Sequence, residues 1–295
     1  MLSFLGEAMK TTPLEELTTT AVRILLQKLE EKLSADVFTY YGEISNGIEH
    51  NVKAVITELA KEKKHDRICV FLTTSGGSLL PVQRMVSILR HFYNQVDFII
   101  PDYAFSAGTI WCMSGDNIYM NYYSCLGPID PQVTNKEGHF VAALGYLDKI
   151  NELLEKANNG TLSQAEFLIL KDFDLAELRS YEQAKELAVD MLKKWLTDYK
   201  FSKWERHSKT GAPVTLEEKQ SRAIEIANKL SDNNIWKSHG RPIGIDILRK
   251  ELKLEIIDFD DDIELSDIIN QYYNALYEYI VGHKYSTFIQ TRLFI

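Results

Sequence analysis

Two short segments of this chain combine residue types that could carry out acyl transfer. Ser106 follows a strand-like run and precedes an apolar, helix-like run, and Gly76 and Gly77 occupy a similar turn upstream. Acyl transfer requires a nucleophile, a base that activates it and N–H donors that stabilise the oxyanion. The Ser106 hydroxyl could be the nucleophile. The backbone N–H groups of Gly76, Gly77 and Ala107 could supply the donors, helped by the positive end of the following helix.

Each of the two segments also has a simpler interpretation. A serine at this position could be the N-cap of a helix, which needs no chemistry. The two glycines could form a tight turn or a phosphate-binding loop. The sequence contains neither the G-x-x-x-x-G-K-[ST] string of a P-loop nor the G-x-G-x-x-G dinucleotide fingerprint, so nucleotide binding is the weaker hypothesis.

The elements that must position these turns alternate along the first half of the chain. Apolar periodicity and β-branched runs predict helices at 13–33, 51–61, 79–93 and 106–114, and strands at 37–41, 68–72, 96–100 and 118–120. This alternation predicts an α/β fold with a mostly parallel sheet and flanking helices. Such sheets bind ligands at the carboxyl ends of their strands, and both turns fall at such ends.

The character of the chain changes after Pro131. Helices are predicted at 140–157, 163–199, 243–252 and 265–281, with another beginning near the capping-box signal at Thr215. We therefore expect an N-terminal helical arm at 1–35, an α/β core at 36–160 and a helical C-terminal extension at 161–295. Amphipathic arms need an apolar partner, so we expect both arms to pack against neighbouring subunits.

Composition narrows the classes of function. The net charge of −9 argues against a general nucleic-acid binder. The start of the chain lacks the basic region of a signal peptide, and no uncharged apolar stretch reaches the roughly 18 residues that a spanning helix needs. A cytoplasmic protein without membrane association is expected. The three cysteines lack the spacing of a disulfide framework or zinc site, and we expect no metal.

Three motifs together resemble a known family. Thr74-Ser75-Gly76-Gly77, Ser106-Ala107-Gly108-Thr109 and Gly127-Pro128-Ile129-Asp130-Pro131-Gln132 occur in this order. They resemble the Clp-protease and signal-peptide-peptidase-A superfamily, which has the crotonase-like fold, and most closely its serine dehydrogenase proteinase (SDH) branch. Segments 174–184 and 236–243 also look like that branch.

The resemblance implies a serine peptidase that hydrolyses peptide bonds through an acyl-enzyme on Ser106, without ATP. It implies an oxyanion hole made by the glycine turn, with Gly77 the better candidate than Gly76, together with Ala107. It also implies a peptide or unfolded protein as substrate, a ring-like homo-oligomer and no organic cofactor.

The general base is the least determined part of the site. Clp proteases carry a histidine downstream of the serine, where this chain reads Pro128-Ile129-Asp130-Pro131. Some signal-peptide-peptidase-like relatives use a Ser–Lys dyad, which makes Lys149 on the predicted 140–157 helix the first candidate. Lysine acts as a base at neutral pH only if burial lowers its pKa; otherwise Lys149 is a solvated helix residue. Lys136 is closer to the motif but lies in a polar turn.

Histidines offer the alternative bases. His239 lies in a motif-like loop that could fold over the site, and His139 is a second candidate. A lone histidine in a loop is more often structural than catalytic. Asp130 could orient a base or could merely cap a turn.

Two competing functions keep the same fold. A catalytically degenerate protein would retain the glycine turn and bind peptides without cutting them, as a scaffold. Acyl-CoA chemistry would share the oxyanion hole, but it needs no serine nucleophile, so the motif around Ser106 counts against it.

Overall fold

The computed structural model describes residues 13–129, 132–134 and 140–294 of the chain. Its central feature is a six-stranded sheet with the strand order β10-β5-β3-β2-β1-β11. These strands are β1 (Asp36–Gly42), β2 (Arg67–Thr73), β3 (Gln95–Ile99), β5 (Asn117–Met120), β10 (Ile257–Asp258) and β11 (Thr287–Gln290). All neighbouring strands pair in parallel except β11, which runs antiparallel to β1. The fold is therefore α/β with a mostly parallel sheet, as the sequence predicts.

Both faces of the central sheet are buried, because side chains alternate between two apolar layers. Phe38, Val70 and Phe98 are in register across β1, β2 and β3 and belong to the larger core. Val37 and Cys69 are also in register but belong to a second core on the opposite face. Burial on both faces explains why the strands read as continuous apolar runs.

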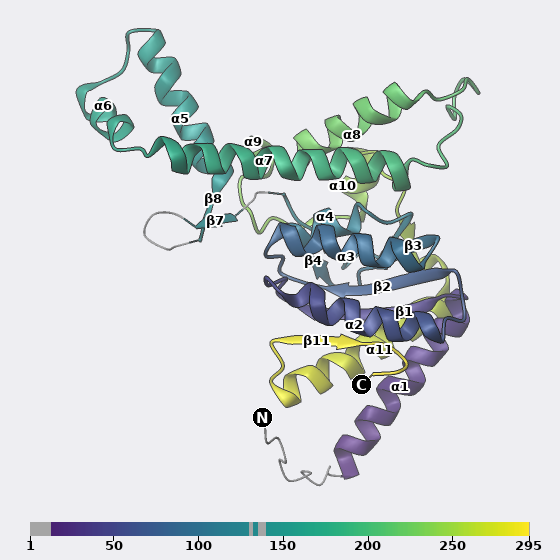
Figure 1. The fold of residues 1–295 in the computed structure, drawn as a ribbon. Coiled ribbons are helices and arrows are strands. Elements are labelled where there is room, and N and C mark those ends of the chain that lie inside the picture. The colour runs from purple at the N-terminus through teal and green to yellow at the C-terminus, as the bar shows by residue number, and fades with distance from the viewer. Residues whose placement is uncertain (1–12, 130–131, 135–139, 295) are drawn as a thin grey trace.

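Helices cover the two faces unequally. The larger core takes side chains from α2 (Ile48–Lys61), α3 (Leu79–Phe92), α4 (Ala107–Cys112), α7 (Leu175–Trp195) and α8 (Leu216–Leu230). The second core contains α1 (Pro13–Leu33) and α11 (Ile263–His283). Figure 1 shows α7 running across the end of the molecule beyond α3 and α4, with α5 (Ala143–Asn158) and α6 (Gln164–Lys171) projecting to one side.

Short elements complete the chain. They are α9 (Asn233–Trp236), α10 (Ile245–Lys250), a π-helical turn at Leu196–Lys200, a 3-10 turn at Phe259–Asp261, and a hairpin of β7 (Gln132–Thr134) and β8 (Phe140–Ala142). A small second sheet has the order β4-β6-β9, built from β4 (Tyr103–Ala104), β6 (Cys125–Leu126) and β9 (Ile243–Gly244). This second sheet matters for function because β4 directly precedes Ser106.

Three features differ from the sequence prediction. The segment after residue 160 is not wholly helical, because β10 and β11 add strands to the central sheet. Much of the apolar face of α1 packs in the second core with α11 of the same chain, whereas the sequence predicts packing against a neighbouring subunit. The predicted helix at 163–199 is two helices, α6 and α7, each with its own capping residue, Ser163 and Asp174. The domain boundaries at 35 and 160 stay predictions.

The helices offer no candidate for a membrane span. Within the described ranges, none is both long and apolar enough to cross a bilayer.

Candidate active site

Ser106 occupies a strained backbone position between β4 and α4. Its φ of 53° and ψ of −117° lie where residues other than glycine are rarely found. The side chain does not cap α4, and in the part of the chain that the structure describes nothing hydrogen-bonds to its hydroxyl. The residue is only 7% exposed. Strained backbone positions of this kind occur at functional sites. Because the Ser106 side chain makes no capping hydrogen bond, the interpretation of Ser106 as a helix N-cap does not hold.

The glycine turn lies directly against Ser106. A Cβ atom added to Gly76 would come within 2.8 Å of the Ser106 Cβ and 2.7 Å of the Phe105 carbonyl oxygen. The φ of Gly76 is +98°, so a side chain there would be both strained and blocked. The two turns therefore meet as the sequence predicts, because only glycine allows their backbones to approach so closely.

Backbone hydrogen bonds hold the two turns together. The Thr74 N–H donates to the Tyr103 carbonyl at 3.1 Å, and the Phe105 N–H donates to the Thr74 carbonyl at 3.0 Å. On the other side of the glycine turn, the Ile44 N–H donates to the Gly76 carbonyl at 2.8 Å. These bonds connect the end of β2 with the end of β4 and with the loop after β1.

The N–H groups near Ser106 divide into engaged and available donors. The Gly76 N–H donates to the Thr74 hydroxyl at 3.0 Å, so it is already used. The N–H groups of Gly77 and Ala107 have no hydrogen-bond acceptor among the described residues. Ile44 bonds to the groups that flank Gly77, which leaves the peptide N–H of Gly77 on the opposite side of the segment. Of the three predicted oxyanion donors, Gly77 and Ala107 are the two available ones.

A buried hydroxyl fixes the segment that follows the Ser106 turn. The Thr109 Oγ1 atom lies 2.8 Å from the Ala104 carbonyl oxygen and 3.0 Å from the Gly127 carbonyl oxygen, and accepts from the Gly127 N–H at 3.0 Å. It therefore joins α4 to the end of β4 and to the Gly127-Pro128 segment, which explains why these two motifs lie side by side.

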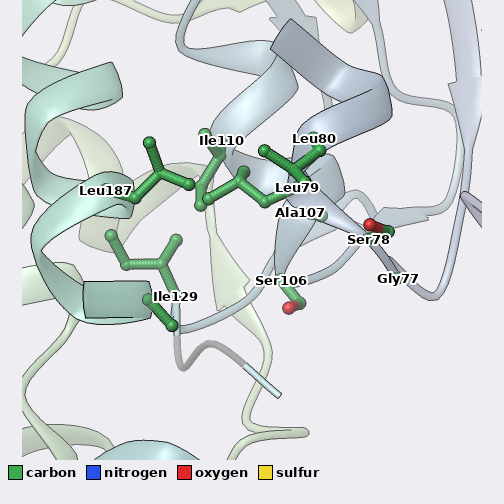
Figure 2. A pocket seen from close by; sticks show the side chains of 10 residues that line it. Gly77, Ser78, Leu79, Leu80, Ser106, Ala107, Ile110, Ile129 and Leu187 are labelled. Atoms are coloured by element: carbon green, nitrogen blue, oxygen red, sulfur yellow. The ribbon is translucent and has the colours of Figure 1, made fainter. Parts of the chain in front are cut away.

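Two cavities adjoin Ser106, and both are also lined by Gly77 and Ser78. One is an apolar pocket of about 190 Å³, and Figure 2 shows Ile110, Ile129 and Leu187 gathered around it beside Ser106. The other is a larger groove of about 620 Å³, lined mainly by the loop after β1, the glycine turn and His239. A bound chain could thus extend to both sides of the Ser106 hydroxyl.

His239 reaches the groove from a distant part of the sequence. Strand β9, four residues later, pairs with β6, which pairs with β4 next to Ser106. Before the histidine, the buried Trp236 anchors the loop by donating from its indole N–H to the Lys229 carbonyl at 2.6 Å. The Nδ1 atom of His239 is buried and has no hydrogen-bond partner among the described residues. An imidazole is thus placed in the same groove as the Ser106 hydroxyl.

Lys149, the first candidate for the base, does not line this groove. Lys149 is 54% exposed, pairs with Glu152 at 2.9 Å and lines a separate hollow on α5. A lysine must be buried to act as a base at neutral pH, and Lys149 is not buried. Asp130, Lys136 and His139 lie outside the described residues.

Sequence reasoning missed several residues that line the two cavities. Glu43, Ile44 and Asn46 come from the loop after β1, and Leu187 comes from α7. None belongs to a motif, and only the parallel order of β1 beside β2 could have indicated the loop. The residues of α7 carry no local sequence pattern that indicates their contribution to the pocket, because that contribution depends on how a distant helix packs.

The thiols near the site are poor competing nucleophiles. Burial raises the pKa of Cys125 on β6 to about 11 and raises the pKa of Cys112 on α4 well above its usual value. Both thiols therefore stay protonated near neutral pH. Across residues 13–129, 132–134 and 140–294, no cluster of histidine, cysteine or carboxylate side chains could hold a metal ion.

Two solved structures are similar to this chain. Both are the 1510-N membrane-bound stomatin-specific protease, one a lysine-to-alanine mutant in complex with a substrate peptide and the other a serine-to-alanine mutant. The first is 14% identical with a TM-score of 0.44, covering 74% of this chain and 72% of that one. The second is 12% identical with a TM-score of 0.45, covering 77% and 81%.

Two proteins of Methanocaldococcus jannaschii, both uncharacterized, are similar in sequence. One is 28% identical over 189 residues and the other 24% identical over 186 residues, which are 64% and 58% of this chain. The aligned regions cover 51% and 57% of those proteins, so the chain spans about half the length of the curated relatives it matches.

A family model covers the larger part of the chain and includes both turns of the site. The model of the ClpP-like SDH-type serine proteinases matches residues 48–237. The match contains the glycine turn, Ser106 and α7, and ends two residues before His239. The chain therefore belongs to the family of ClpP-like SDH-type serine proteinases.

Proposed function

We propose that this protein is a serine peptidase that hydrolyses peptide bonds through an acyl-enzyme on Ser106. The observation that carries the proposal is the contact between the two turns, where Gly76 leaves space for only a hydrogen atom beside the Ser106 Cβ. This contact brings a hydroxyl and two unpaired N–H groups, those of Gly77 and Ala107, to the junction of two cavities. Family membership supports the same reaction class.

The reaction would proceed in two steps, the acylation of Ser106 and the hydrolysis of the acyl-enzyme. The Ser106 Oγ attacks the substrate carbonyl carbon while its proton passes to the imidazole of His239, and the N–H groups of Gly77 and Ala107 donate to the oxyanion. The C–N bond then breaks and the imidazole gives the proton to the leaving amine. Water next attacks the ester carbon and loses a proton to His239. The ester C–O bond then breaks, the imidazole returns that proton to the Ser106 Oγ, and the acid leaves.

The substrate would be an extended segment of a peptide or unfolded protein. The loop after β1 and the glycine turn offer backbone groups at the edge of the groove, where an extended chain could pair. A ring-like homo-oligomer that shelters the site stays a prediction, as does a cytoplasmic location.

Labelling by a fluorophosphonate probe tests the nucleophile. The unmodified protein should be labelled, and Ser106→Ala should not be. Ser87→Ala is the matched control because Ser87 is exposed on α3 and its hydroxyl donates to the Gln83 carbonyl at 3.0 Å; it should be labelled like the parent. Equal labelling of Ser106→Ala and the parent would remove Ser106 from the mechanism and favour a noncatalytic peptide-binding protein.

A second comparison tests the base. General-base catalysis contributes about 10²–10⁴-fold, so His239→Ala should slow labelling and peptide hydrolysis by that order. Lys149→Ala, which removes an exposed ion pair, should change neither rate by more than about twofold. If Lys149→Ala is the slow variant and His239→Ala is not, the assignment of the base is reversed.

A further inference from the structure

We propose that a tyrosine-lined pocket at the carboxyl edge of the central sheet binds the arginine side chain of a peptide, at a site separate from Ser106. The pocket measures about 700 Å³. Two carboxylates and four tyrosines of its lining carry the proposal: Asp102, Asp260, Tyr122, Tyr123, Tyr273 and Tyr277. The pocket shares no lining residue with the two cavities beside Ser106, so this inference goes beyond the peptidase function.

Neighbouring parallel strands bring part of the pocket lining together. Asp102 follows β3, Asn121 follows β5 and Asp260 follows β10, and these three strands are neighbours in the order β10-β5-β3. Parallel sheets of α/β proteins bind ligands at the carboxyl ends of their strands. The pocket therefore lies where this class of fold binds ligands, at the edge of the sheet that also carries the glycine turn after β2.

One face of α11 supplies much of the remaining lining. Tyr273 and Tyr277 lie four residues apart, hence on one face of the helix. Their ring centroids are 6.2 Å apart and the rings are tilted by 40°. The family match ends at residue 237, so α11 and Asp260 lie outside it. This half of the pocket is thus built by a part of the chain that the family model does not include.

A hydrogen-bonded turn presents the other two tyrosines. Asn121 is only 5% exposed, and its Oδ1 atom accepts from the N–H groups of Tyr123 and Ser124 at 3.0 and 3.1 Å. Its amide group donates to Asp260 at 3.4 Å. Tyr122 and Tyr123 are nevertheless 83% and 63% exposed. A buried amide therefore holds two large rings in solvent, and such rings gain free energy when a ligand covers them.

Each carboxylate of the pocket keeps one oxygen atom without a donor. Tyr273 donates its hydroxyl to Asp102 Oδ2, and Ser266 donates its hydroxyl to Asp260 Oδ1, both at 2.6 Å. Burial and the bond to Asp102 raise the pKa of Tyr273, so this hydroxyl stays protonated and keeps donating. Among the described residues no donor bonds to the second oxygen of either carboxylate, and no cationic side chain pairs with them. Both second oxygens are available to a ligand.

A guanidinium group matches this lining in charge and shape. It is always charged, it donates parallel N–H groups to carboxylates, and its planar face stacks on aromatic rings. In the described chain no positively charged residue lines the pocket, and the net charge of −9 attracts cations. An anionic ligand would be repelled by the two carboxylates. Within the described ranges, these carboxylates form no cluster that could hold a metal ion.

The volume of the pocket indicates a peptide rather than an isolated side chain. A cavity of about 150 Å³ holds one benzene molecule, whereas this pocket measures about 700 Å³. Residues that flank the arginine would therefore lie in the pocket as well.

The first experiment measures peptide binding to the full chain by isothermal titration calorimetry. The chain carries Ser106→Ala, so that cleavage cannot consume the probe and the result does not depend on the peptidase function. The probes are acetyl-Gly-Gly-Arg-Gly-Gly-amide and the same peptide with citrulline, which keeps the shape of arginine but has no charge. We expect the arginine peptide to bind with a Kd below about 1 mM and the citrulline peptide to bind at least about tenfold more weakly. Equal binding of the two, or no binding of the arginine peptide, would overturn the proposal.

Variants in the same background locate the binding. Asp102→Asn keeps an oxygen that can accept from Tyr273 but removes the charge, and it should weaken arginine binding at least about tenfold. Tyr122→Ala removes one exposed ring and should weaken binding about threefold or more. Asp267→Asn is the matched control, because Asp267 is exposed on α11, bonds to Gln271 and lies outside the pocket; it should bind like the parent.

Two further measurements make the test decisive. Urea denaturation checks that the variants fold; Tyr122→Ala changes only an exposed ring, so its midpoint should equal that of the parent. Arginine binding by Asp102→Asn and Tyr122→Ala as tight as by Asp267→Asn would contradict the assignment of the site. Tyrosine rings with carboxylates also suit a neutral sugar, so maltotetraose is titrated in parallel. Binding of maltotetraose without binding of the arginine peptide would overturn the proposal.

Discussion

The reactive serine and its oxyanion donors depend on backbone geometry more than on side-chain chemistry. Ser106 adopts a positive φ without being glycine, and Gly76 and Gly77 adopt positive φ values of 98° and 135°. Glycine adopts positive φ without steric cost, but at Ser106 such a position costs about 1–3 kcal/mol and persists where the surroundings fix it. Here the close contact between the two turns fixes the strained conformation of Ser106, so the same contact maintains the strain and forms the site.

Gly77→Ala tests this dependence at the residue scale. A Cβ at position 77 would lie 2.3 Å from the Ile44 carbonyl oxygen, so the turn must move and its N–H must leave the oxyanion hole. We expect a loss of labelling rate of about 10²-fold or more and a loss of about 1–3 kcal/mol in unfolding free energy, measured by probe kinetics and urea denaturation.

Gly47→Ala is the control for Gly77→Ala. Gly47 also has a positive φ, 93°, but a Cβ there would meet no atom of the described residues within 4 Å. It should lose stability from backbone strain while keeping the labelling rate. Unaltered labelling of Gly77→Ala would show that this turn does not form the oxyanion hole.

At the scale of elements, the three short strands β4, β6 and β9 do more for the site than their lengths suggest. Strand β4 ends just before Ser106, β6 pairs with it in parallel, and β9 pairs with β6 from a segment over a hundred residues later. The pairing Leu126↔Ile243 fixes where the loop with His239 returns. Thr109 joins α4 to this small sheet through its hydroxyl.

Replacing Thr109 by valine keeps the shape and removes the hydroxyl. The Ala104 carbonyl and the Gly127 backbone groups would lose a buried partner, which destabilises a protein by about 1–3 kcal/mol. We expect that loss in urea denaturation, together with slower probe labelling, because α4 and the Gly127 segment would no longer be held in register.

The matched control for that change is Thr161→Val. The hydroxyl of Thr161 is exposed and bonds to the Lys156 carbonyl at 3.3 Å, so its removal should alter stability by less than about 0.5 kcal/mol. Equal stabilities of Thr109→Val and Thr161→Val would contradict a bridging role for Thr109.

At the scale of the whole molecule, α7 links the site to the opposite end of the sheet. Its face bearing Ala184 and Leu187 closes the apolar pocket, while the turn that follows it brings Lys200 to Asp116, just before β5. Burial lowers the pKa of Lys200 from 10.5 to about 8, although Glu255, Asp97 and Asp116 oppose this shift. A positive charge is therefore held where burial disfavours it.

This lowered pKa predicts a pH dependence of stability. Between about pH 8 and about pH 10.5 the unfolded chain binds more protons at Lys200 than the folded one, so this residue makes the unfolding free energy rise with pH in that window. Lys200→Met should remove that part of the rise, so its stability relative to the parent should be greatest near about pH 7.

Urea unfolding at several pH values from about 7 to about 10 measures this effect. Lys149→Met, which replaces an exposed lysine on α5, serves as the control and should follow the parent curve. Parallel curves for Lys200→Met and the parent would contradict the prediction.

The sequence by itself determined the α/β alternation, the two turns and their meeting point. Strands buried on both faces read as continuous apolar runs, such as 68–72, and turn chemistry is local, so Gly76 and Ser106 could be placed at strand ends without coordinates. Parallel strands then align those ends at one edge of the sheet. Strands of two residues, such as β9 and β10, left no readable pattern.

Only the tertiary structure decided which side chains surround the serine. Lys149 is nearer to Ser106 along the chain, yet α5 carries it outward into an ion pair, whereas His239 returns through the pairing of β9 with β6. Leu187 reaches the pocket because α7 packs over α4. Such placements arise from contacts between distant segments, which depend on the packing of the whole chain and have no counterpart in local residue patterns.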